Sequence, residues 1–159
     1  MVPLGRHVAR CNETLTVGEI YRCEVIEERS MRSHRHYFAT MHEAWLNLPD
    51  HLALQFANDT ALRKHALILT GYRKERKLAL SSPEEARKVA AFLKPRGGDD
   101  YAIISVNGNV VVEWTAMSQS AREMKGPTFQ KSKDDTLDFI ANLVGVTPEQ
   151  LTANAGQAA

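Results

Sequence analysis

Residues 101–117, YAIISVNGNVVVEWTAM, decide the fold class of this 159-residue chain. Tyr101–Val106 and Val110–Met117 are rich in the β-branched and aromatic residues that favour strands. Asn107-Gly108 between them is the strongest short-range signal for a β-hairpin. The stretch therefore predicts two antiparallel strands joined by a tight turn.

Helical signals lie on both sides of this hairpin. The clearest is Ser82-Pro83-Glu84-Glu85, a capping box with Ser at the N-cap, Pro at N1 and Glu at N3 ahead of apolar positions at helical spacing. Further helices are predicted at about 34–48 (capped by Ser33, stopped by Pro49), around 52–56, from a cap at Asp59 or Thr60 to Leu69, at 129–144, and after Thr147. Two more strands are expected, at 17–27 and 72–80.

These elements predict a single α+β domain. The sequence contains no internal repeat and no linker long enough to divide it, and its length is typical of one domain. We expect a short antiparallel sheet, including the hairpin at about 101–117, packed against four to five helices. A flexible N-terminal arm (1–15) and a disordered tail (152–159) should flank a domain over 16–151.

Composition excludes several classes of protein. No apolar run approaches the roughly 20 residues that span a bilayer, and the N-terminal sequence MVPLGRHVARCNE lacks the apolar core of a secretory signal. Cys11 and Cys23 show no CxxC spacing, which indicates neither a disulfide framework nor structural zinc. We therefore expect a protein of the reducing cytoplasm, without a membrane partner.

The formal net charge of +1 conceals an asymmetry. Residues 1–98 carry 16 Lys/Arg and 11 Asp/Glu, whereas residues 99–159 carry 4 Lys/Arg and 8 Asp/Glu. The basic excess is concentrated in two clusters. The first comprises Arg29, Arg32, His34, Arg35 and His36, and the second comprises Arg63, Lys64, Arg73, Lys74, Arg76 and Lys77. Such clusters attract polyanions, although a solvated charged surface has the same composition.

Recognisable catalytic motifs are absent from the sequence. It contains no HExxH, GxSxG, GxGxxG or P-loop pattern, and on a helix the rings of His34 and His36 would point to different sides. We therefore predict no catalytic residue, no metal ligand and no cofactor. The carboxylates of Asp99, Asp100, Asp134, Asp135 and Asp138 leave a magnesium-dependent nuclease as an alternative, although paired Asp more often caps helices.

A binding surface is the better-supported hypothesis. The arginines of the first cluster can bind phosphate oxygens near a helix start, where the helix dipole favours the same anion. Tyr37 and Tyr72 adjoin the two clusters and, with His36, offer planar rings on which an unpaired base could stack. The alternative is that both tyrosines are half-buried at the edge of the core.

The stretch RSMRSHRHYFATMHEAW, residues 29–45, resembles the RS…QN…W core of phage NinB-type recombination proteins. It also looks like the HRxYFALL helix of prophage proteins of unknown function, whose second helix is similar to residues 60–72. The chain has His34-Arg35-His36 where the NinB family has its Gln-Asn pair. The resemblance implies a dimeric α+β accessory of phage recombination, expressed in a bacterial host, that binds DNA beside single-strand-binding protein.

These observations predict a non-catalytic phage or prophage accessory protein that binds nucleic acid, with single-stranded DNA favoured, in recombination or replication. The alternative is a protein-binding effector, such as an inhibitor of a host CRISPR or other defence nuclease, whose basic clusters face an acidic protein surface or a nucleic-acid channel. The opposite charges of the two halves, and the apolar residues Phe129, Leu137, Ile140, Leu143 and Val144, are compatible with a homodimer. The alternative is that the helix at 129–144 covers the hairpin at 101–117 within one chain. Phe38, Met41 and Trp45 should form one buried stripe.

Overall fold

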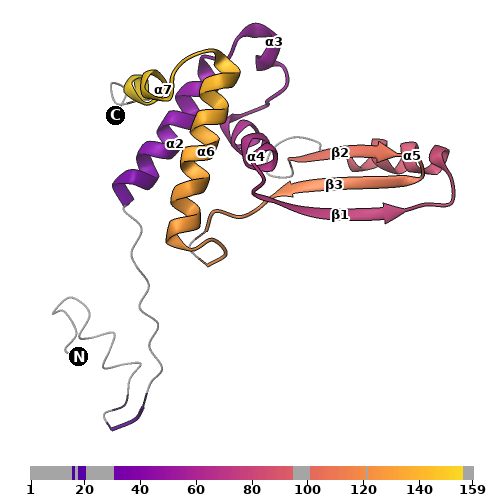
Figure 1. Cartoon of the computed structure of the whole chain (residues 1–159), viewed down its shortest axis with the longest axis horizontal. Helices are drawn as coiled ribbons and strands as arrows, with labels where there is room; N and C mark the ends of the chain where they lie inside the picture. The colour runs from indigo at the N-terminus through magenta and orange to yellow at the C-terminus, as the bar shows by residue number, and fades with distance from the viewer. Residues whose placement is uncertain (1–15, 17, 21–30, 95–100, 121, 156–159) are drawn as a thin grey trace.

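Helix α2 (Met31–Leu46) and helix α6 (Gly126–Val144) lie side by side in a helical lobe, from which a three-stranded sheet projects (Figure 1). The computed structural model describes residues 16, 18–20, 31–94, 101–120 and 122–155. The expected arm at 1–15, most of the expected strand at 17–27, and Arg29 therefore lie outside the described residues. The α+β class and the antiparallel sheet are confirmed.

The helical lobe has its own apolar core. Tyr37 and Met41 of α2 are fully buried against Leu62 of α4 (Asp59–Leu69) and Ile140 of α6. The short helices α3 (Asp50–Ala53) and α7 (Pro148–Ala155) close this lobe. The predicted stripe on α2 is therefore confirmed in part: Met41 is buried, whereas Phe38 and Trp45 are half-buried at the edge of the core.

The sheet has the strand order β1-β3-β2, with β1 (Arg73–Ala79), β2 (Ala102–Asn107) and β3 (Val110–Ala116) antiparallel. Because Asn107 pairs with Val110, the hairpin turn consists of Gly108 and Asn109, and Gly108 has a φ of +59°. A positive φ at the first central residue alone is typical of the type II′ turn, which favours glycine there. The sequence predicted this hairpin but placed its turn one residue too early.

Helix α5 (Pro83–Leu93) packs on one face of the sheet. Its start is the predicted capping box, since the Glu85 N–H donates to Ser82 Oγ at 3.2 Å. Ala86 and Ala90 pack on Val111 of β3 and form a second, smaller core. In the described part of the chain no helix packs along the other face, because α4 meets the strands only at the end nearest the lobe (Figure 1).

Several of the predicted helix boundaries are wrong. The residue at which a helix begins or ends depends on the contacts that its terminal residues make in the folded chain. Helix α2 already includes Ser33, which is therefore not its cap, and the cap of α4 is Asn58, whose side chain accepts the Ala61 N–H at 2.8 Å. Helix α6 begins at Gly126, and α7 extends to Ala155 into the expected tail. None of the helices in the described ranges is both long and apolar enough to cross a membrane.

The apolar residues of α6 pack into or against the core of the same chain. Phe129 and Ile140 are buried, and Leu137, Leu143 and Val144 pack against the main core, between α2, α4 and α7. Phe129 and Ile140 are therefore not available to a second copy, whereas Leu137, Leu143 and Val144 stay partly exposed at the edge of the core. The homodimer stays a prediction.

Candidate nucleic-acid interface

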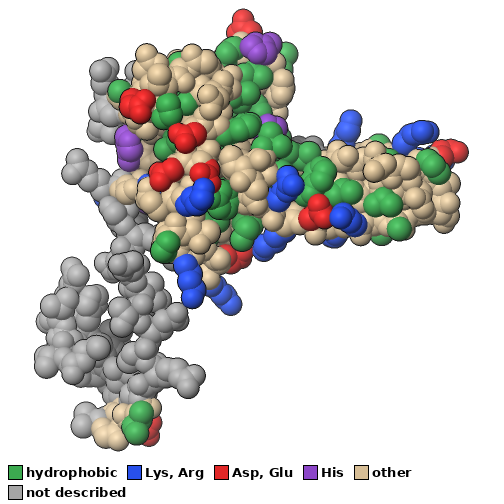
Figure 2. Space-filling model, in the orientation of Figure 1, with side chains coloured by type: hydrophobic (Ala, Val, Ile, Leu, Met, Phe, Trp, Pro, Cys, Tyr) green, Lys and Arg blue, Asp and Glu red, His purple; other side chains and the backbone are tan. Residues whose placement is uncertain are grey.

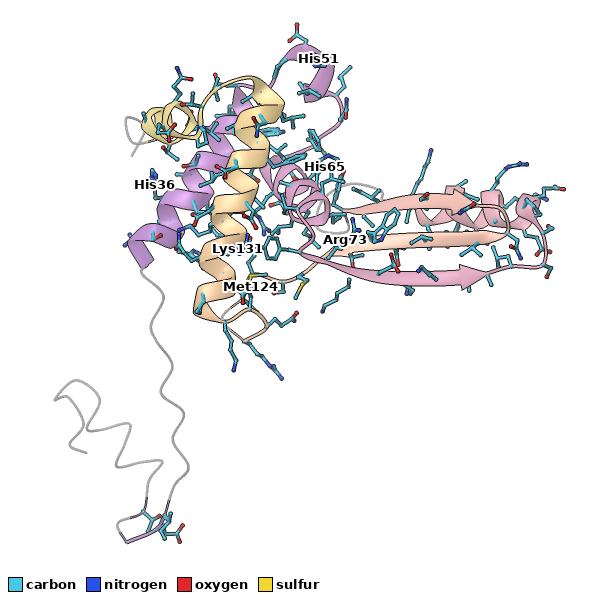
Figure 3. The ribbon with its side chains drawn as sticks, viewed as in Figure 1. His36, His51, His65, Arg73, Met124 and Lys131 are labelled. Carbon is cyan, nitrogen blue, oxygen red and sulfur yellow. The ribbon has the colours of Figure 1, made fainter. Side chains whose placement is uncertain are left out.

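The first basic cluster is divided between two sides of α2. His34 faces the neighbouring helix α6, where its ring stacks 5.6 Å from that of Phe129, and it lines a hollow described below. His36 is exposed on another side of α2 (Figure 3), and Arg35 is exposed as well. Arg32 lies in the first turn of α2. His34 and His36 therefore lie on different sides of α2, as the helical spacing predicted.

The two tyrosines predicted to stack on bases, Tyr37 and Tyr72, both form hydrogen bonds within the protein. Tyr37 is 0% exposed, its hydroxyl is hydrogen-bonded to Thr136 Oγ1 at 3.0 Å, and burial raises the pKa of its phenol. The predicted stacking role of Tyr37 is therefore wrong, because no base can reach its ring. Tyr72 is half-buried, and its hydroxyl donates to Asp135 Oδ2 at 2.6 Å, which joins the start of β1 to α6.

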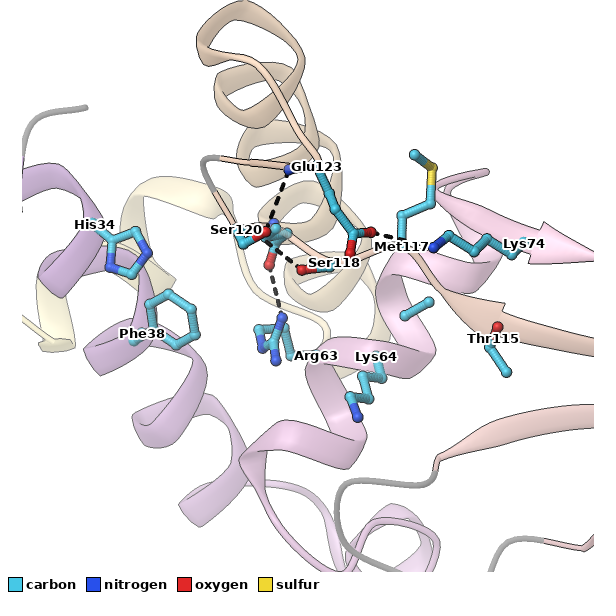
Figure 4. Close-up of a pocket in the computed structure, with 12 residues that line it drawn as sticks. His34, Phe38, Arg63, Lys64, Lys74, Thr115, Met117, Ser118, Ser120 and Glu123 are labelled. Carbon is cyan, nitrogen blue, oxygen red and sulfur yellow. Dashed lines mark hydrogen bonds and ion pairs between the residues drawn. The ribbon is translucent and has the colours of Figure 1, made fainter. Parts of the chain in front are cut away.

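A hollow at the base of the sheet brings distant basic residues together (Figure 4). It has a volume of about 520 Å³, and we call it the basic hollow. Its walls come from four elements and one loop: His34 and Phe38 of α2, Arg63 and Lys64 of α4, Lys74 of β1, Thr115 and Ala116 of β3, and Met117, Ser118, Gln119, Ser120 and Glu123 of the segment after β3. Parts of both predicted clusters therefore meet at one site.

Arg63 is held in a fixed position at the centre of the basic hollow (Figure 4). Its Nη1 donates to Gln119 Oε1 at 2.8 Å, and its Cζ lies 5.2 Å from the centre of the Phe38 ring. Gln119 is itself buried and donates to Ser132 Oγ at 3.0 Å. Because its partners are fixed, the guanidinium loses little freedom when it binds an anion.

Lys74 provides a second cation at the opposite wall. Its Nζ lies 3.2 Å from Glu123 Oε2, and both side chains are exposed to solvent. An exposed ion pair of this kind contributes about 0–1 kcal/mol, so a phosphate can replace the carboxylate at little cost. Among the described residues that line the basic hollow, three are Lys or Arg and one is a carboxylate, so their formal charges sum to a positive value.

The basic residues on β1 alternate between the two faces of the sheet. Lys74 and Arg76 lie on the face that α5 covers, whereas Arg73 and Lys77 lie on the opposite face. Arg76 pairs with Glu113 at 2.6 Å, and Lys77 pairs with Glu75 at 2.8 Å. The six basic residues of this cluster are thus spread over α4 and both faces of the sheet.

Trp114 of β3 is a functional candidate that the sequence analysis missed. It is half-buried on the same face as Arg73, whose Cζ lies 5.2 Å from the centre of the indole. The signal was present, because strand alternation places Val110, Val112 and Trp114 on one face. Only the arrangement of the described helices shows that α5 packs on the opposite face and none of them on this one. The sequence analysis assigned Phe38 to a buried stripe, and it gave no functional role to the residues after β3 that line the basic hollow.

No group of three or more His, Cys, Asp or Glu side chains that could hold a metal ion occurs among the described residues. No family model, no curated protein and no solved structure matches this chain. The resemblance to NinB-type and prophage proteins therefore stays a prediction.

Proposed function

We propose that this protein binds single-stranded nucleic acid, with DNA favoured, through the basic hollow and strand β1, as a non-catalytic accessory of phage recombination or replication. The observation that supports the proposal is the convergence of Arg63, Lys64 and Lys74, from two elements, with His34 from a third, in one hollow. Clustered cations supply most of the affinity for a phosphate backbone.

The chemistry of the walls suits a nucleotide strand. A volume of about 520 Å³ is within the range of small-molecule sites and can hold one nucleotide unit. The hydroxyls of Thr115, Ser118 and Ser120 are of the type that bonds phosphate oxygens, and the Phe38 ring adds an apolar wall. In the view of Figure 2, most acidic side chains lie over the helices, while Lys and Arg side chains line the sheet. A polyanion is therefore attracted toward the sheet.

Fluorescence anisotropy of labelled oligothymidylate across a salt series tests the proposal. With four phosphate contacts, the slope of log K against log salt should be about −3, because each contact with a single strand contributes about −0.7. A Lys64→Ala/Lys74→Ala double variant should bind more weakly and show a slope reduced by about 1.4. Oligouridylate in parallel compares RNA with DNA.

Lys88→Ala is the matched control. Lys88 on α5 forms an ion pair with Glu84 at 2.8 Å, which is exposed like the Lys74–Glu123 pair but lies outside the basic hollow. This control should bind like the wild type. Absence of binding at low salt, a slope near zero, or equal losses in Lys88→Ala and the double variant would contradict the proposal and favour a protein partner.

A further inference from the structure

The face of the sheet along which no described helix packs offers a surface distinct from the basic hollow. We call it the open face, and it carries Arg73, Glu75 and Lys77 of β1, with Val112 and Trp114 of β3. The register places Trp114 between Glu75 of β1 and Ile103 of β2, near the middle of the face. The sheet lobe in Figure 2 shows apolar side chains among Lys and Arg side chains.

Two neighbours, Glu75 and Arg73, contact the Trp114 ring on this face. The indole Nε1–H donates to Glu75 Oε2 at 2.8 Å, and Lys77 Nζ holds Glu75 Oε1 at 2.8 Å. The Arg73 guanidinium lies 5.2 Å from the centre of the indole. The bonds from Lys77 and Trp114 lower the pKa of Glu75, which favours the ionised carboxylate that accepts the hydrogen bond from the indole N–H. The aromatic surface is therefore pre-positioned.

We infer that Trp114 and Arg73 form a stacking site for an unpaired base, with Lys77 placed to bind a neighbouring phosphate. The inference rests on the proposed function, and it adds that the protein selects nucleic acid whose bases are unpaired. Aromatic rings and guanidinium planes stack on any base, and this contact is available only when the base has left a duplex. Lys77 and Arg73 give the face the positive charge that a phosphate backbone needs.

The geometry of β1 allows one single-stranded nucleic acid to contact both the open face and the basic hollow. Because side chains alternate, Lys74 projects toward the basic hollow while Arg73 projects toward the open face. Strand β1 is an edge strand, and its outer edge has no partner strand among the described residues. A flexible single strand can cross this edge and contact both sites. A duplex cannot, since its persistence length is about 150 base pairs.

The test compares oligothymidylate with an abasic strand of the same length, which keeps the phosphates and lacks the bases. Trp114→Leu removes the aromatic ring and keeps an apolar side chain on the sheet. This variant should bind oligothymidylate about 5- to 100-fold more weakly and bind the abasic strand like the wild type. Lys64→Ala/Lys74→Ala should weaken the binding of both strands, and a duplex of the same length should bind more weakly than oligothymidylate.

A second measurement leaves Trp114 in place. In a Trp45→Phe protein Trp114 is the remaining tryptophan, and a stacked base should quench its fluorescence, whereas the abasic strand should not. If saturating oligothymidylate leaves this emission unchanged, or if Trp114→Leu binds oligothymidylate as the wild type does, the stacking site is refuted while the proposed function stands. If Trp114→Leu changes the mass measured by light scattering but leaves the preference for oligothymidylate over the abasic strand unchanged, the open face is a protein interface. Wild-type protein that binds neither strand overturns both proposals.

Discussion

Replacement of Tyr37 tests whether this residue is part of the core or part of a binding surface. Tyr37 is 0% exposed, and its hydroxyl bonds Thr136 Oγ1 at 3.0 Å across the α2–α6 interface. The Thr136 hydroxyl also bonds the Ser132 carbonyl at 2.7 Å, so Tyr37→Phe leaves Thr136 with a partner. This variant should therefore lose one net hydrogen bond, about 1 kcal/mol of the free energy of unfolding. Tyr37→Ala empties the ring site and should cost about 3–5 kcal/mol.

Urea denaturation gives these free energies, and thermal melting provides a second measurement, because 1 kcal/mol corresponds to a shift of about 2–4 °C for a domain of this size. Each variant that remains folded should bind oligothymidylate like the wild type, since the Tyr37 ring does not reach solvent. A Tyr37→Ala protein with wild-type stability and lost binding would refute the assignment of Tyr37 to the core. The ring would then be a stacking surface, as the sequence had suggested.

Two further predictions concern the helical lobe. Trp45→Phe removes the bond from the indole N–H to the Phe56 carbonyl, at 2.9 Å, and should lower the free energy of unfolding by about 1 kcal/mol in urea; unchanged stability would contradict that bond. His65 is hydrogen-bonded to the Tyr101 hydroxyl at 2.7 Å, and burial lowers the pKa of its imidazole. As the pH falls, His65 is therefore protonated in the unfolded chain before it is protonated in the folded one. The free energy of unfolding should then decrease as the pH drops below about 6.5. His65→Asn should reduce this loss in melting temperatures recorded from neutral pH to about pH 5, and an identical profile for both proteins would exclude His65 as its source.

Local signals determined most of the secondary structure. The hairpin at 101–117 was predictable because turn residues and β-branched runs act over a few neighbouring positions. The start of α5 followed in the same way, as did that of α7, where the Gln150 N–H donates to Thr147 Oγ1 at 3.2 Å. The concentration of basic charge and its position along the chain were also visible in the sequence. These features depend on residues a few positions apart, so no knowledge of packing was needed.

The tertiary structure alone decided which side chains reach solvent and which meet each other. Tyr37 is buried because its partner Thr136 comes from a helix 99 residues away, and no local pattern encodes that contact. His34 and Lys74 line one hollow because α2 packs on α4 and α4 contacts the sheet, whereas His36, two positions from His34, is exposed on another side of α2. Trp114 became a candidate only when α5 was seen to cover the opposite face of the sheet. Exposure results from the packing of elements distant in sequence, and that packing determines which basic and aromatic residues can share a ligand.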